Sequence, residues 1–181
     1  MFLGSWLLVA NFLMGNSTPP SNWTAAQTYR GISNYTNNQM GITKRAMKQL
    51  RTHLGFSQLR FFCSKQQGRT FHLTTVANSS GEAVVQYFSG QTDVLPAACG
   101  SFQRMDDDSQ LAVTCDQWGN EDGNHHVGKW GHYNKTEQHQ MYNHAAFVAF
   151  KCHWVISGGK WLRDDGGNTL FVISSRDFWK I

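Results

Sequence analysis

Four cysteines and five glycosylation sequons constrain this chain more than any other feature of its sequence. The cysteines form no C-x-x-C pair, which is the usual start of a zinc or redox motif. Cysteines without C-x-x-C spacing, together with many N-x-Ser/Thr glycosylation acceptors, are typical of chains that fold in an oxidising secretory compartment. We therefore expect a secreted, disulfide-bonded glycoprotein. The residues concerned are Cys63, Cys99, Cys115 and Cys152, with sequons at Asn16, Asn22, Asn34, Asn78 and Asn134.

The sequence leaves the disulfide pairing open, because four cysteines allow three pairings. A bridge between Cys99 and Cys115 would close a loop of about 15 residues and stabilise the fold by roughly 3 kcal/mol in the entropic account. Cys63 and Cys152 would then remain to pair with each other. The alternative is two buried free thiols.

Size and composition favour one folded domain that spans residues 1–181. The hydrophobic share of 40% and aromatic share of 13% are too high for a disordered chain. The net charge is +4, and its longest basic element is Lys44, Arg45, Lys48 and Arg51 on one predicted helix. We interpret this element as a solvated face and expect no nucleic-acid partner, although the excess positive charge would also suit an acidic glycan.

Hydrophobic patterning predicts a mixed α+β fold. The apolar run Trp6–Asn11 favours a buried strand over a signal remnant, and it is too short to insert into a membrane. Thr43 and Gly55 bound a predicted amphipathic helix. A hairpin is predicted over residues 59–76, and a second helix follows, with Ser79 and Glu82 as a capping box. Later strands are expected at 145–156, 171–173 and 178–181, and the abrupt end at Ile181 suggests a fragment of a longer chain.

Residues 90–143 lack clear periodicity, and a segment of this length without periodicity is usually functional or disordered. Asp106, Asp107 and Asp108 carry carboxylates of the kind that Ca²⁺ prefers, with Asp116 close by in the sequence. The alternative is a solvated acidic turn, since Asp is a common turn former. Calcium is the one cofactor that the sequence suggests.

The stretch from Trp118 to Tyr133 combines aromatic rings with hydrogen-bonding groups, as sugar-binding sites do. In the alternative interpretation, the tryptophans pack inward and the glycines turn the chain. The candidate ligand-binding residues are Trp118, Asn120, Glu121, His125, His126, Trp130, His132 and Tyr133.

Motifs for catalysis and for zinc are missing from the sequence. Six histidines lie between residues 125 and 153, yet they form no H-E-x-x-H motif. The sequence also contains no G-x-S-x-G motif, P-loop or dinucleotide fingerprint. We therefore predict a binding protein rather than an enzyme.

Several segments together resemble the fibrinogen C-terminal-like domains of cnidarian extracellular proteins, including uncharacterised coral skeletal organic matrix proteins. The sequence departs from the family in three places: three consecutive Asp replace the family's Asp-x-Asp-Asn-Asp run, Arg163 stands where relatives tend to carry Cys, and the chain stops at Lys180-Ile181, short of the usual terminal strand residues. The segments are Trp6–Ala10, Leu59–Lys65, Gly68–Thr75, Ser79–Gln91, Ala98–Phe102, Gly128–His132 and Asp177–Lys180.

The resemblance implies a fibrinogen-related α+β fold with a central, mostly antiparallel sheet, short helices and a long loop-rich region for calcium and ligand. It also implies an extracellular binding or adhesion module, with calcium-dependent recognition of glycans or of extracellular matrix glycoproteins. The alternative function is a structural component of an extracellular or skeletal organic matrix without a defined small ligand. The +4 net charge argues against direct nucleation of mineral.

Overall fold

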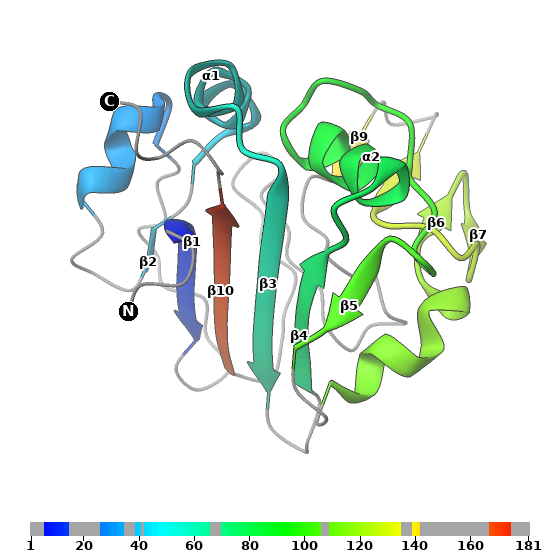
Figure 1. Ribbon diagram of the computed structural model, residues 1–181. Helices are drawn as coiled ribbons and strands as arrows, with labels where there is room; N and C mark the ends of the chain where they lie inside the picture. Colours follow the sequence, from blue (N-terminus) through cyan, green and yellow to red (C-terminus); the bar gives the residue numbers. More distant parts are fainter. Residues whose placement is uncertain are drawn as a thin grey trace.

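The computed structural model describes residues 6–14, 26–34, 39–40, 42–65, 70–105, 109–134, 139–141 and 167–174. Within these residues, helices and antiparallel strands form a mixed α+β arrangement (Figure 1). The predicted strands at 145–156 and 178–181 lie outside the described residues. The apolar run near the N-terminus forms a strand, as predicted.

A large antiparallel sheet is the centre of the described structure, with strand order β2-β1-β10-β3-β4-β5. Sequence neighbours β3 and β4 pair as the predicted hairpin. The strand β10 comes from the far end of the described chain and lies between β1 and β3 (Figure 1). The strands are β1 (Trp6–Met14), β2 (Gln39–Met40), β3 (Gln58–Lys65), β4 (Thr70–Thr75), β5 (Phe102–Arg104) and β10 (Gly167–Ser174).

Helix α1 (Lys44–Leu54) begins and ends where the sequence predicts. The Thr43 side chain accepts a hydrogen bond from the Ala46 backbone N–H at 3.3 Å, which satisfies one of the free donors of the first turn. Gly55 adopts a left-handed conformation at φ 56° and donates its N–H to the Arg51 carbonyl. The short 3₁₀ helix η1 (Tyr29–Asn34) packs beside α1.

Helix α2 (Ser79–Phe88) corrects the predicted capping box by one residue. The cap is Asn78, whose side-chain oxygen accepts hydrogen bonds from the backbone N–H groups of Ser80 and Gly81. Since Asn78 caps the helix, Glu82 lies one position too far along to complete the box, and its carboxylate binds Arg51 of α1 instead. This contact joins the two helices.

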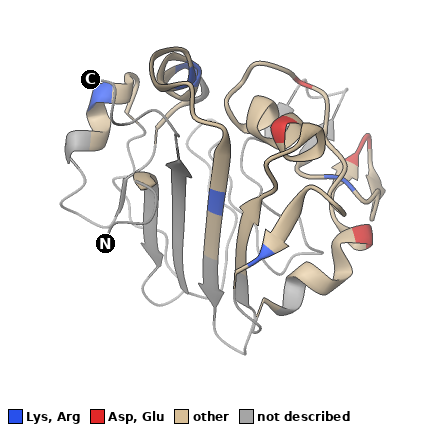
Figure 2. Cartoon of the chain, in the orientation of Figure 1, with Lys and Arg blue, Asp and Glu red and all other residues tan. Residues whose placement is uncertain are grey.

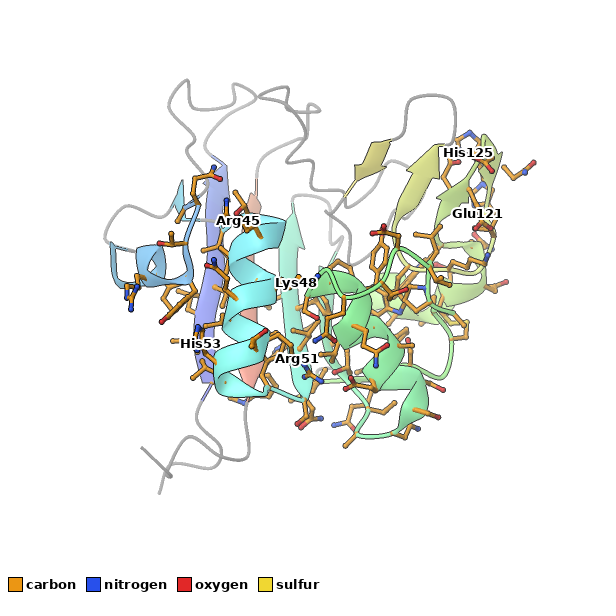
Figure 3. All side chains as sticks on the ribbon, turned by 90° about the horizontal axis from the view of Figure 1, so that it is seen from above. Arg45, Lys48, Arg51, His53, Glu121 and His125 are labelled. Atoms are coloured by element: carbon orange, nitrogen blue, oxygen red, sulfur yellow. A yellow bond between two sulfur atoms is a disulfide. The ribbon has the colours of Figure 1, made fainter. Side chains whose placement is uncertain are left out.

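The main core lies between the large sheet and the two helices, which are on the same side of it (Figures 1 and 3). The strand residues Leu59, Phe61 and Leu73 are 0%, 5% and 0% exposed, as expected where alternate side chains face a buried layer. Phe88 of α2 packs edge-on against Phe61, with ring centroids 5.1 Å apart. Within the described residues, no helix has both the length and the apolar character that crossing a membrane requires.

A smaller sheet lies beyond β5 and carries the strands on which the site is built. Its strand order is β7-β6-β8-β9, with β6 and β8 parallel and the other pairs antiparallel. The 3₁₀ segment η3 (Gln110–Gln117) leads into it. Its strands are β6 (Asn120–Glu121), β7 (Asn124–His125), β8 (His132–Asn134) and β9 (His139–Met141).

Candidate functional site

Two fully buried tryptophans lie within the stretch that the sequence predicts for ligand binding. Trp118 and Trp130 are both 0% exposed, with ring centroids 5.1 Å apart at an interplanar angle of 78°. Trp118 also stacks on Phe102 of β5, and Trp130 packs edge-on against Phe88 of α2. The structure thus favours inward packing for both tryptophans and corrects their assignment as ligand platforms, because neither ring presents a face to solvent.

A buried hydrogen-bond network holds Trp130 in place. The indole Nε1–H donates to the Ser101 hydroxyl oxygen at 2.7 Å, and the Trp130 backbone N–H donates to the Pro96 carbonyl at 2.9 Å. The Ser101 hydroxyl in turn donates to the Ala98 carbonyl. Every polar atom named here is paired, as burial of an indole N–H requires.

The disulfide Cys99–Cys115 ties the segment before β5 to η3, at a Cα–Cα distance of 5.3 Å. It is one of the bridges that the sequence left open. Cys152 lies outside the described residues, so the Cys63–Cys152 pairing remains a prediction. The bridge anchors the chain just ahead of Trp118.

Shortly after Trp118, the chain turns back in a short polar hairpin of β6 and β7. Asn120 pairs with His125, and Glu121 with Asn124. The two residues of the turn are Asp122 and Gly123, at φ 51° and φ 84°. Positive φ at both central positions is the signature of a type I′ hairpin turn, for which Asp-Gly is a favoured pair. This dipeptide is the signal by which the sequence alone could have located the hairpin.

Asn120 stiffens the hairpin from within and is not available to a ligand. It is 4% exposed. Its side-chain oxygen accepts the Gly123 backbone N–H at 3.2 Å, and its side-chain nitrogen lies 3.1 Å from Nδ1 of His125. The prediction that Asn120 binds ligand is therefore corrected to a positioning role.

His126 is exposed and is held in a conformation that few residues adopt. Its φ of 61° lies in the left-handed region, which costs an L-residue free energy. Two hydrogen bonds fix it: the backbone N–H donates to the Gly119 carbonyl at 3.0 Å, and ring Nδ1 lies 2.9 Å from the Gln117 carbonyl. Because a carbonyl only accepts, Nδ1 must carry the proton. In the neutral form of the imidazole, Nε2 is then an acceptor.

The remaining polar groups of the hairpin surround the two histidines. Glu121 and Lys129 form an ion pair with side chains 38% and 36% exposed. Asn124 and His125 are exposed, and Figure 3 shows Glu121 and His125 at the same outer end of the small sheet. Asn124 was not among the predicted ligand residues, and the structure places it opposite Glu121 in the hairpin.

The side chains of the other predicted site residues are not described. The backbones of His132 and Tyr133 lie in β8, next to β6, but their side chains are not described. Asp106, Asp107 and Asp108 lie outside the described residues. Among the described side chains, no group of three His, Cys, Asp or Glu residues is placed to hold a metal ion.

Both ends of the acidic segment are nevertheless fixed at a single residue of β4. The Met105 backbone N–H donates to the His72 carbonyl at 2.9 Å. The buried Ser109 hydroxyl accepts from the His72 N–H at 2.8 Å and donates to the same carbonyl at 3.0 Å. Met105 and Ser109, the residues on either side of the acidic segment, therefore both lie next to His72.

Gly119 lies close to the backbone of Lys129, so alanine substitutions at Gly119 and Gly123 should differ in their effect on stability. Gly119 and Gly123 have almost the same φ, 83° and 84°. A Cβ at Gly119 would lie 2.4 Å from the Lys129 carbonyl oxygen, whereas one at Gly123 would meet nothing within 4 Å. We expect Gly119→Ala to lower the free energy of unfolding by about 1–3 kcal/mol more than Gly123→Ala, measured by chemical denaturation. Equal losses would show that backbone conformation alone matters.

Comparisons with protein-family models, with curated proteins and with solved structures found no match to this chain.

Proposed function

We propose that the chain is an extracellular binding module that recognises glycans through the β6–β7 hairpin. The observation that carries this proposal is His126, an exposed imidazole held in left-handed backbone conformation by two hydrogen bonds. Costly backbone conformations of this kind cluster at binding and catalytic sites.

The chemistry of the hairpin suits a ligand rich in hydroxyl groups. Carboxylate oxygens at Glu121 and imidazole nitrogen at His126 accept hydrogen bonds, while the Asn124 side chain both donates and accepts. A rigid frame lowers the conformational entropy that binding would otherwise cost. Trp118 and Trp130 are fully buried and are not among the residues proposed to contact the ligand.

The fibrinogen-related family and a secreted location belong to the same proposal. The family rests on the sequence segments that resemble it, and the antiparallel α+β arrangement is compatible with it. The Cys99–Cys115 disulfide supports a secretory route, since such bridges form and persist in oxidising compartments. Calcium is proposed as the ion that this recognition requires, with the carboxylate oxygens of Asp106, Asp107 and Asp108 as ligands.

The proposal is tested by a screen of neutral glycans with calcium and with a chelator, using the protein, His126→Asn and His53→Asn. Asn tolerates the left-handed region, so His126→Asn should fold normally, while its shorter side chain places no acceptor at the position of Nε2. His53 is an exposed histidine on α1 and serves as the matched control. We expect binding to a defined class of neutral glycan that is at least about ten-fold weaker in His126→Asn, corresponding to the loss of a hydrogen bond at a preorganised site.

Three results would contradict parts of this proposal. Binding that is equal in His126→Asn and the parent protein would place the ligand elsewhere. Binding unchanged by the chelator would contradict the calcium site. No binding at all from a demonstrably folded protein would contradict glycan recognition and leave the structural matrix role as the better account.

A further inference from the structure

The chain separates its charges along the sequence, and this separation carries over to the fold. Residues 1–81 hold eight of the 16 Lys and Arg residues and none of the 12 Asp and Glu residues. In Figure 2 the described carboxylates lie on α2, on the loop that follows it, and in the region of η3 and the small sheet, whereas α1 and η1 carry only basic groups. A surface with one sign of charge builds up a potential that attracts the opposite sign.

Helix α1 turns a basic stripe toward solvent. Arg45 and Lys48 are exposed and lie about 4.5 Å apart along one face of the helix, and the neutral Thr52 continues the same face. The opposite face, with Met47 and Leu50, is buried in the core. The direction of the stripe is therefore set by the packing of the helix and not by the flexibility of the side chains.

The basic surface continues from α1 onto η1. The rings of His53 and Tyr29 lie 5.0 Å apart, and the guanidinium of Arg30 lies 5.3 Å from the centroid of the Tyr29 ring. His53 and Arg30 are both exposed. Figure 3 shows Arg45, Lys48 and His53 on α1, in front of the large sheet. We call Arg30, Arg45, Lys48 and His53 the α1–η1 surface.

No described carboxylate neutralises the stripe. Glu82 is the acidic residue that reaches α1, and its two oxygens accept from Nη2 of Arg51 at 2.8 and 3.1 Å. Gln86 also donates to it, at 3.1 Å. The ion pairs of Glu82 with Arg51 and of Glu121 with Lys129 do not involve Arg45 or Lys48 of the described helix.

We propose that the α1–η1 surface binds a sulfated linear polysaccharide, at a site separate from the β6–β7 hairpin. A row of sulfates along a polymer complements a row of cations along a helix, and each contact is a charge-assisted hydrogen bond. The disulfide is typical of chains that fold for an oxidising environment, where such polymers are the abundant polyanions.

Two other polyanions fit the surface less well. Membrane-binding helices place large apolar side chains beside their basic ones. The large apolar side chains that are exposed in the described residues are Val94, Met105 and Val113, none of which lies on α1. Binding of single-stranded nucleic acid uses exposed aromatic rings for stacking, whereas Tyr29 is half-buried against His53.

The test measures the affinity of the purified protein for heparin and for chemically desulfated heparin by surface plasmon resonance. We expect Arg45→Gln to weaken heparin binding about three-fold and the double variant Arg45→Gln/Lys48→Gln about ten-fold, as expected for exposed ion pairs. Arg104→Gln, an exposed arginine on β5, is the matched control and should bind as the parent does. Affinity should fall steeply with salt, because binding releases counterions.

The proposal is overturned if Arg104→Gln weakens binding as much as Arg45→Gln, or if desulfated heparin binds equally well. Equal affinity for duplex DNA or for anionic lipid vesicles at the same ionic strength would also overturn the assignment to sulfated polysaccharide. Both substituted side chains are exposed, so the variants should fold, and circular dichroism checks this. The hairpin variant His126→Asn should leave heparin binding unchanged, so the two proposals can fail separately.

Discussion

Trp130→Ala should lower the free energy of unfolding by about 3–5 kcal/mol, the range for removing a large buried aromatic side chain. Trp130 is fully buried and contacts Phe61, Phe88 and Trp118, with ring centroids 5.1–5.7 Å away. The substitution would leave a cavity where the large sheet, α2 and the small sheet meet. Equilibrium denaturation in guanidinium chloride, followed by circular dichroism, measures the loss.

The matched control for this prediction is Trp130→Phe. It retains an aromatic ring in the core but removes the Nε1–H that the Ser101 hydroxyl accepts at 2.7 Å. Ser101 still donates to Ala98, so the loss should be roughly 1–3 kcal/mol. A loss below about 1 kcal/mol for Trp130→Ala would contradict the central role of this residue in the core. A binding defect in Trp130→Ala would report damage to the fold and not a contact with ligand.

Removing the Cys99–Cys115 bridge by the double substitution Cys99→Ala/Cys115→Ala should cost about 3 kcal/mol of unfolding free energy. The two cysteines are 16 residues apart, and the entropy that the bridge removes from the unfolded chain depends on the length of this loop. The expected result is a lower midpoint of chemical denaturation, compared with the parent protein under non-reducing conditions.

The control for the disulfide prediction uses a reductant. The double variant has no Cys99–Cys115 bridge to reduce. A reductant should therefore lower the free energy of unfolding of the double variant less than that of the parent protein. Unchanged stability in the double variant would mean that the loop is ordered without the bridge. Such a result would assign the anchoring of η3 to Trp118 and Ser109.

Local elements could be predicted because the residues that determine them are close in sequence. Thr43 and Gly55 bound α1 through hydrogen bonds to residues three and four positions away. The β3–β4 hairpin likewise depends on alternating side chains and a short connection. The error at the start of α2 is also local, because it concerns two adjacent residues. Asn78 and Ser79 are both good N-cap residues, and the extended backbone conformation of Asn78 makes it the N-cap.

The sequence singled out the stretch that holds the hairpin, but it did not separate the buried residues of that stretch from the exposed ones. The sequence marked the stretch from Trp118 to Tyr133 as dense in aromatic and polar groups, and the hairpin lies within it. Burial then divided the residues: Trp118, Asn120 and Trp130 face inward, while His125 and His126 face solvent. Composition cannot make this division, because an aromatic residue is equally suited to a core and to a binding surface.

By itself, the sequence determined the class of fold, both helices, the β3–β4 hairpin and the N-terminal strand, since each follows from hydrophobic period and from capping chemistry. Only the tertiary structure decided that β10 lies between β1 and β3, which pairs residue 171 with residues 61 and 10. It also decided that the two tryptophans share one core and that Glu82 pairs with Arg51. These contacts join residues far apart in the chain, so they depend on the packing of whole layers and not on any local pattern.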